Sequence, residues 1–194
     1  SGAIMARRAA YKLQEGMQMQ MKCVFLDPGH GGLWRGECTQ GLRESRQNLC
    51  VSNKAARLLE VEGRVVRCSH RGDSRLPPEG RVAVVRRCEP DALVIIHHSR
   101  RNTPCYVSVG GAPGAGPASE KLAASVAKCL SEIGLTVRGL PCMEERCGDV
   151  LQVQEGAGRA GIVLEFPLCI RCVTCRDEYA RAIACGVSNY LDLT

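Results

Sequence analysis

Short apolar runs alternate along this chain with stretches whose apolar residues recur every three or four positions. The most continuous runs each predict a strand buried on both faces, and they lie at residues 23–26, 91–97 and 161–166. Weaker strand patterns lie at residues 64–69, 106–109, 136–140 and 150–153. Helical periodicity is present at residues 45–61, 79–88, 118–133 and 177–191.

Strands that alternate with helices are typical of an α/β fold. We therefore expect a twisted, mostly parallel sheet with helices on both of its faces. A chain of 194 residues is long enough to bury one sizeable core, so we expect a single domain. We assign residues 22–194 to this domain and residues 1–21 to an N-terminal extension, in which residues 1–4 are expected to be a cloning remnant.

Membrane spans and secretory signals are not expected in this chain. The longest apolar run, Ala92–Ile96, is far too short to cross a bilayer. The first residues do not follow the pattern of a signal peptide, which has a basic start, an apolar stretch and a cleavage site. We therefore expect synthesis in the cytoplasm, and we favour a monomer.

The formal net charge of +6 favours polyanionic partners. Nucleic acid, anionic lipid and the acidic polymers of a cell wall all belong to this class. Aromatic residues make up only 4% of the chain, whereas surfaces that stack nucleic-acid bases rely on aromatic side chains. Nucleic acid is therefore not expected as a partner.

Candidate metal ligands and acid–base groups follow three of the expected strands. His30 follows the first strand, His97 and His98 end the central strand, and Glu165 lies near the end of the last. Glu44 precedes the first helix of the domain. Active sites of α/β sheets gather at the carboxyl ends of strands. Two histidines and one glutamate make a zinc site with a position left for water, and a further carboxylate can transfer protons.

Each of these side chains also has an ordinary structural interpretation. A histidine at a strand end is often a hydrogen-bonded polar residue, and a glutamate before a helix complements the helix dipole. Glu165 lies inside the apolar segment Ile162–Phe166, where an unpaired carboxylate is costly, so it needs either a metal site or a buried arginine. His98 is a reserve ligand, but neighbouring strand residues point to opposite faces, and we therefore keep His97.

The segment Val24–Gly32 contains Asp27-Pro28-Gly29-His30-Gly31-Gly32 at the end of a short apolar strand. It resembles the opening motif of the zinc-dependent N-acetylmuramoyl-L-alanine amidases of bacterial autolysins and phage endolysins. The resemblance extends over about residues 22–191 through further segments at 41–44, 48–49, 70–73, 94–97, 119–123 and 163–165, together with Leu76 and Arg81.

The resemblance implies that His30, Glu44 and His97 bind Zn2+ and that Glu165 is the catalytic carboxylate. The implied reaction is hydrolysis of the amide bond between N-acetylmuramic acid and L-alanine in bacterial peptidoglycan. Without a signal peptide, the chain is expected to be a phage endolysin that reaches the wall at lysis. The alternatives are a bacterial autolysin, a sporulation amidase, or a non-catalytic zinc-containing module that binds the cell wall.

Two further residues are candidates for contact with the substrate. Trp34 is the only tryptophan and lies on the loop after His30, where it either contacts the substrate or caps the core. Arg71 lies within the segment 70–73 that takes part in the resemblance.

Cysteine is unusually frequent, with 13 residues, and we expect most of them to be reduced thiols. Four lie within apolar patterns and are expected to be small buried hydrophobes: Cys23, Cys50, Cys129 and Cys185. A tighter cluster, Cys169-x-x-Cys172-x-x-Cys175, follows the last strand. Its spacing is open to a second, structural metal site, to a disulfide, or to free thiols.

Overall fold

The computed structural model describes residues 21–100, 106–110, 116–139, 159–169 and 173–194, with the backbone alone for residues 106–110. Residues 1–20 of the N-terminal extension and the strand expected at residues 150–153 lie outside the described residues. Within the described part of the chain, no helix is long and apolar enough to span a membrane.

A six-stranded sheet forms the centre of the fold, in the order β4-β1-β5-β8-β6-β7. Its strands are β1 (Cys23–Pro28), β4 (Val65–Cys68), β5 (Ala92–Ser99), β6 (Tyr106–Gly110), β7 (Thr136–Gly139) and β8 (Ala160–Pro167). All neighbouring strands run parallel except β6 and β8, which are antiparallel. The expected mostly parallel sheet is therefore confirmed.

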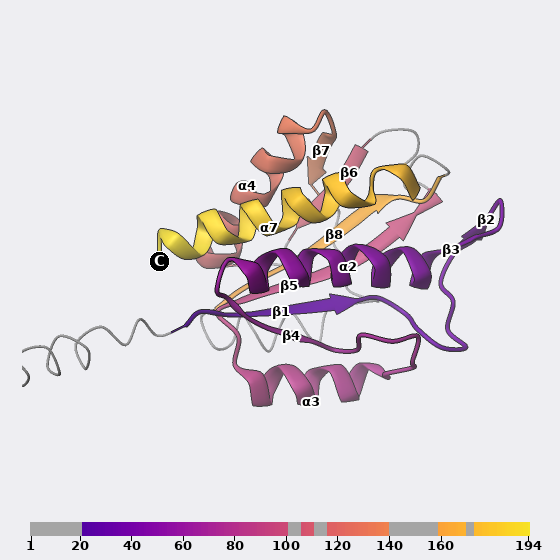
Figure 1. Cartoon of the computed structure of the whole chain (residues 1–194), viewed down its shortest axis with the longest axis horizontal. Coiled ribbons are helices and arrows are strands. Elements are labelled where there is room, and N and C mark those ends of the chain that lie inside the picture. Colours follow the sequence, from indigo (N-terminus) through magenta and orange to yellow (C-terminus); the bar gives the residue numbers. More distant parts are fainter. Residues whose placement is uncertain (1–20, 101–105, 111–115, 140–158, 170–172) are drawn as a thin grey trace, which may run out of the picture.

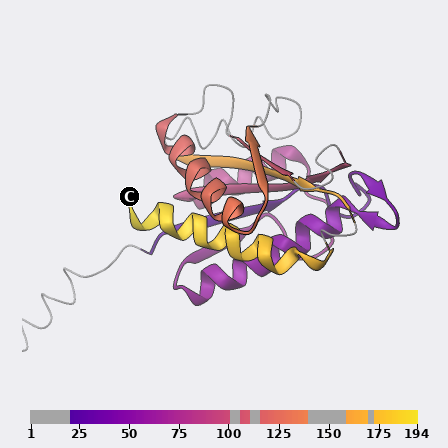
Figure 2. The ribbon, with the colours of Figure 1, turned by 90° about the horizontal axis from the view of Figure 1, so that it is seen from above.

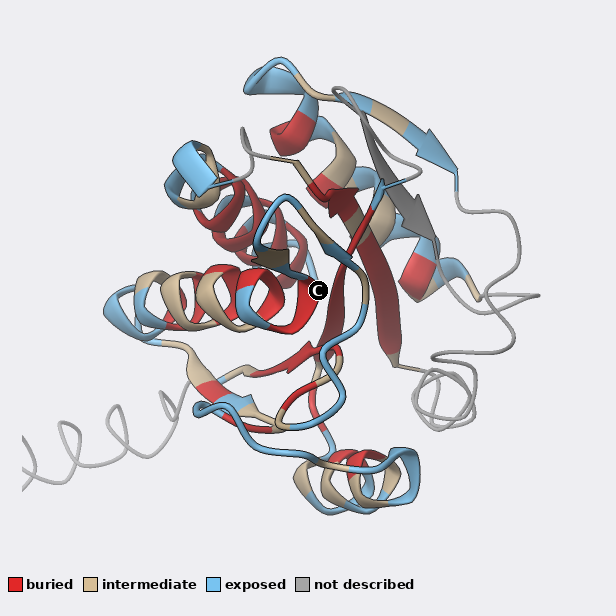
Figure 3. Cartoon of the chain, turned by 90° about the vertical axis from the view of Figure 1, so that its right-hand side faces the viewer, coloured by how far each residue is buried: buried red, intermediate tan, exposed pale blue. Residues whose placement is uncertain are grey.

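Helices cover both faces of the sheet (Figure 1). The larger core lies under α2 (Glu44–Val61), α4 (Pro117–Glu132) and α7 (Arg176–Asp192). A smaller core of Phe25, Val85, Leu93, Ile95 and Val163 lies under α3 (Pro78–Cys88). Figure 3 shows the buried strands between these layers, which explains why their sequences are almost continuously apolar.

Every strand and helix expected within the described residues is present, with ends that differ by at most two positions. One small element was not predicted, a hairpin of β2 (Cys38–Thr39) and β3 (Leu42–Arg43). Its strands are too short for a periodic pattern. Its turn residues, Gln40 and Gly41, have φ angles of 46° and 76°, the left-handed values that two-residue hairpin turns favour.

The parallel strands β1, β5 and β8 end at one edge of the sheet, at the right of Figure 1 beside the β2–β3 hairpin. The helix α2 begins at this same edge with Glu44. Chain reversals therefore bring residues from four distant parts of the sequence to one place, as α/β sheets do at the carboxyl ends of their strands.

Candidate metal centre

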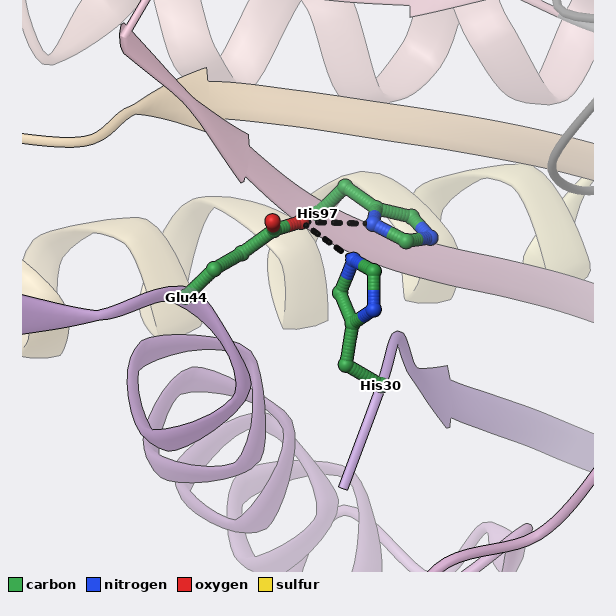
Figure 4. A group of neighbouring side chains, drawn as sticks. All are labelled: His30, Glu44 and His97. Atoms are coloured by element: carbon green, nitrogen blue, oxygen red, sulfur yellow. Dashed lines mark hydrogen bonds and ion pairs between the residues drawn. The ribbon is translucent and has the colours of Figure 1, made fainter. Parts of the chain in front are cut away.

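Three of the predicted site residues converge at this edge of the sheet (Figure 4). His30 follows β1, Glu44 is the first residue of α2, and His97 lies near the end of β5. One side-chain nitrogen or oxygen from each lies within 4.8 Å of the other two. Within the described residues, this is the one group of three or more such side chains with metal-ligand spacing.

Glu44 is completely buried and lies at the centre of the group. Its Oε1 atom is 2.7 Å from His97 Nδ1 and 3.1 Å from His30 Nε2. Its Oε2 atom accepts a hydrogen bond of 2.8 Å from the backbone N–H of Glu37. Burial alone would raise the pKa of Glu44, but the two imidazoles lower it more strongly, and the net pKa is well below the usual value. The carboxylate is therefore ionised.

His30 has a left-handed backbone with a φ of 66°, which is uncommon for a residue with a side chain. The buried Arg81 side chain holds this conformation, because it donates 2.8 Å to the His30 carbonyl and 3.0 Å to the Pro28 carbonyl. The same guanidinium pairs with the buried carboxylate of Asp27. A buried ion pair in α3 and β1 thus fixes where the His30 ring points.

Two glycines make room for the cluster. A Cβ atom on Gly29 would lie 2.2 Å from the His97 ring, so only glycine lets the ring pack there. A Cβ atom on Gly36 would lie 2.4 Å from Glu44 Oε2 and 2.6 Å from His30 Cδ2. Gly36 also has a φ of 67°, which glycine adopts at little cost.

His98 does not join the cluster, as its expected orientation to the other face of the strand predicts. Its Nδ1 atom lies 2.7 Å from Asn48 Oδ1, and its ring packs 5.4 Å from the Phe166 ring. Burial is the main reason why the pKa of His98 falls to about 3. Asn48 also donates 2.9 Å to the Gly29 carbonyl. The Asn48 side chain thus links the β1 loop to the end of β5.

Glu165 lies on β8, directly beside His97 in the parallel register of β5 and β8. Paired residues of neighbouring strands place their side chains on the same face, with the strands about 4.8 Å apart. Glu165 is partly exposed, whereas its neighbours Leu164 and Phe166 are buried. Glu165 therefore lies beside the cluster and is partly open to solvent.

The two candidates for substrate contact lie in different surroundings. Trp34 is 46% exposed on the loop after His30, and the Arg75 guanidinium stacks 4.1 Å from its ring centre. Arg71 forms an ion pair of 2.5 Å with Glu60. Glu60 lies roughly 24 Å from Glu44 along α2, given a rise of about 1.5 Å per residue. The Arg71 side chain therefore points away from the metal centre.

The cysteine cluster after β8 is only partly described. Cys169 and Cys175 are free thiols of intermediate exposure, and Cys172 lies outside the described residues. A metal or a disulfide at this cluster stays a prediction. Of the four cysteines expected to be buried, only Cys129 is buried. Cys23 and Cys50 are of intermediate exposure, and Cys185 is exposed.

Sequence reasoning did not assign roles to Gly36, Glu37, Asn48 or Arg81 at this centre. Glu37 supplies the backbone N–H to Glu44, and its carboxylate accepts 2.8 Å from the backbone N–H of Arg100. Gly36 and Glu37 lie between the first two ligand candidates in the sequence, which is the one signal that would have indicated them.

Comparison with known proteins agrees with this geometry. The profile of the family described as N-acetylmuramoyl-L-alanine amidase matches residues 24–142, which include His30, Glu44 and His97 but not Glu165. No curated protein sequence matches the chain.

Several solved structures share the fold. The amidase AmiC2 of Nostoc punctiforme is 23% identical, with a TM-score of 0.74 over 88% of this chain and 97% of that one. An amidase from Clostridium difficile 630 is 24% identical, with a TM-score of 0.74 over 89% and 97%. The catalytic domain of CwlV from Bacillus (Paenibacillus) polymyxa var. colistinus is 22% identical, with a TM-score of 0.73 over 90% and 100%. Since the family profile matches more than half of its residues, the chain belongs to the N-acetylmuramoyl-L-alanine amidase family.

Proposed function

We propose that this protein is a zinc-dependent amidase that hydrolyses the bond between N-acetylmuramic acid and L-alanine in bacterial peptidoglycan. One observation carries the proposal. In a member of this amidase family, the imidazoles of His30 and His97 converge on the buried carboxylate of Glu44 at the carboxyl ends of the strands. A wall-binding module without activity would not require a further carboxylate, Glu165, beside that group.

The donor set fits zinc. Two imidazole nitrogens and one carboxylate oxygen are typical of zinc sites that keep one position open. The buried His30 Nε2 atom lies 3.1 Å from Glu44 Oε1, so two of the candidate ligand atoms already face each other. His30, Glu44 and His97 would hold the ion. Bound zinc supplies a Lewis acid that polarises a carbonyl group and lowers the pKa of water.

We assign proton transfer to Glu165. Its carboxylate takes a proton from the attacking water and then delivers a proton to the nitrogen of the departing alanine. Both transfers need the carboxylate within reach of the scissile amide, and its pairing with His97 across β5 and β8 supports that position. Its partial exposure leaves room for water and substrate.

We further propose that Trp34 contacts the glycan. An exposed indole beside the site offers a flat apolar surface to a sugar ring, and Arg75 fixes the orientation of that indole by stacking on it. The net charge of +6 favours binding to anionic walls. Arg71, paired with Glu60, is the weaker candidate.

The direct test is digestion of purified peptidoglycan by the zinc-loaded protein, followed by mass spectrometry. We expect intact stem peptides with a free L-alanine amino group and glycan strands that remain uncut. A folded, zinc-containing protein that releases no peptide from several wall types would contradict the proposal and favour a wall-binding module.

The variant Glu165→Gln tests the role of the carboxylate separately from metal binding. We expect zinc content and unfolding temperature to stay at wild-type values while turnover falls by at least about a hundredfold, the lower range for loss of a general base. Full activity in this variant would refute the assignment of Glu165.

For the biological setting, we propose a phage endolysin that reaches the wall when the host membrane is breached. We expect expression in a bacterial host to be harmless until a membrane-permeabilising agent is added, and to cause rapid lysis afterwards. An autolysin or a sporulation amidase is favoured if lysis does not follow permeabilisation while purified walls are still digested.

A further inference from the structure

Two cysteine side chains meet where α4 packs on α7, away from the metal centre. The sulfur atoms of Cys129 and Cys185 lie 3.2 Å apart. The amide nitrogen of Asn189 lies 3.7 Å from the first sulfur and 3.5 Å from the second. A disulfide bond is about 2.0 Å long, so the two sulfurs need to approach by only about 1 Å to bond.

The backbones of the two helices hold the sulfurs close together. Figure 2 shows α4 and α7 side by side, and a Cβ atom on Gly186 would lie only 2.5 Å from the Val126 Cα atom. Ser125 Oγ donates 2.7 Å to the Gly186 carbonyl at the same contact. Cys185 adjoins Gly186, and Cys129 lies one helical turn after Ser125. The short sulfur separation therefore follows from a tight helix crossing rather than from one side-chain rotamer.

The two thiols differ in their surroundings, and this difference sets the order of reaction. Cys185 is exposed, whereas Cys129 is buried in the larger core. Burial first, and then the hydrogen bond to Cys185, raise the pKa of Cys129 to about 12. A reagent in solution therefore meets Cys185 first, and Cys129 reacts second with the sulfur beside it.

We propose that Cys129 and Cys185 form a dithiol site that reacts with small-molecule disulfides and closes into a disulfide between α4 and α7. The thiolate of Cys185 attacks one sulfur of the reagent, and the first reagent thiol leaves. Cys129 then loses its proton to solvent and attacks Cys185 Sγ, which breaks the mixed disulfide and releases the second reagent thiol. The two cysteines are oxidised and the reagent is reduced to two thiols.

The cross-link would close a loop that contains the whole of β8, the strand with Glu165. A disulfide across a loop of this length constrains the unfolded chain and raises the unfolding temperature. The inference stands apart from the proposed amidase activity, because neither cysteine contacts the His30–Glu44–His97 cluster.

The test is treatment of the folded, reduced protein with oxidised glutathione, followed by alkylation, trypsin digestion and mass spectrometry. Cleavage after Lys128 and Arg181 gives peptides 129–138 and 182–194, each with a single cysteine. We expect these two peptides to be joined, with no glutathione attached. The exposed Cys38, in peptide 36–43, should instead retain glutathione and serves as the reference thiol in the same sample.

Two variants separate the steps. In Cys129→Ser, we expect Cys185 to keep glutathione as a stable adduct; in Cys185→Ser, we expect the buried Cys129 to stay reduced. Oxidation should raise the unfolding temperature of the wild type by about 5 to 15 °C and leave that of Cys185→Ser unchanged. The proposal is wrong if wild-type Cys185 keeps glutathione, pairs with another cysteine, or stays reduced while Cys38 is fully modified.

Discussion

Among single residues, a glycine rather than a ligand sets one of the tightest steric limits at the metal centre. Gly36 packs against both Glu44 and His30, and no side chain fits between them. Gly41 lies five residues further along the same loop with a similar left-handed φ of 76°, but a Cβ atom there would meet nothing within 4 Å. Alanine variants of the two glycines therefore distinguish the cost of backbone strain from disruption of the metal site.

We predict that Gly36→Ala weakens zinc binding at least about tenfold, because the added methyl group displaces the Glu44 carboxylate. Gly41→Ala should cost about 1 to 2 kcal/mol of stability from its left-handed backbone and leave zinc affinity unchanged. Competition titration with a zinc chelator and urea unfolding measure the two effects. Equal zinc affinity in both variants would show that Gly36 does not shape the site.

The buried Asn48 side chain links two groups that adjoin the metal ligands in the sequence. It accepts a hydrogen bond from His98 and donates one to Gly29, and all three residues are buried. Removing the Asn48 side chain leaves the groups it bonds to buried without a partner. The free energy of unfolding then falls by the desolvation cost of those groups.

We predict that Asn48→Ala lowers the free energy of unfolding by about 2 to 4 kcal/mol, because it leaves two buried polar groups without partners. Asn53→Ala is the matched control on the same helix, since Asn53 donates to the Arg71 carbonyl in an exposed hydrogen bond. The control should cost less than about 1 kcal/mol. Urea denaturation measures the free energy of unfolding of both variants. A similar decrease in the two would argue against a buried hydrogen-bond network around Asn48.

The helix α3 does more than cover the smaller core. Its Arg81 side chain joins the helix to the loop after β1 through Asp27 and through the Pro28 and His30 carbonyls. These contacts use the spread of donors on a planar guanidinium, which the single ammonium group of lysine lacks.

We predict that Arg81→Lys, which keeps the charge, lowers stability by about 2 to 3 kcal/mol and zinc affinity by about tenfold. Arg87→Lys on the same helix changes an exposed side chain and should shift stability by no more than about 0.5 kcal/mol. Unfolding free energies and zinc titrations test both. If Arg81→Lys binds zinc as tightly as the wild type does, the Arg81 contacts are not needed to position His30.

The elements were predictable from the sequence because strands buried on both faces have continuous apolar runs and the helices have clear periodicity. The β2–β3 hairpin was not predictable, because strands of two residues are too short to show an alternating pattern. His30, Glu44 and His97 were predictable because strand ends and the family motif indicate them. Gly36 and Arg81 required the structure, since their roles arise from contacts across the fold.

Across the described part of the molecule, the nine cysteines are free thiols that differ widely in burial. Cys23 is the first residue of β1, Cys68 is the last residue of β4, and Cys129 lies within α4. Burial is the largest reason why the pKa of each of these three thiols is raised. Their protonation is therefore coupled to folding.

We predict that alkali destabilises the reduced protein. An unfolded cysteine loses its proton near pH 8.5, whereas these three thiols keep theirs to higher pH, so above about pH 8.5 the folded state binds more protons than the unfolded state. Stability must then fall as pH rises, by up to about 1.4 kcal/mol per pH unit for each thiol still protonated. For Cys129, whose pKa is raised to about 12, this loss of stability continues up to at least pH 10.

Urea unfolding between pH 7 and 10, in a phosphine reductant that prevents disulfides, measures this slope. Cys129→Ala removes the most strongly shifted thiol, so its stability should decline less steeply than that of the wild type, even if it starts lower. A wild-type profile that is flat or rises above pH 8.5 would mean that the thiols are as accessible to water in the folded state as in the unfolded chain. The cysteines would then be surface groups, and the tight α4–α7 contact around Cys129 would have to open readily in solution.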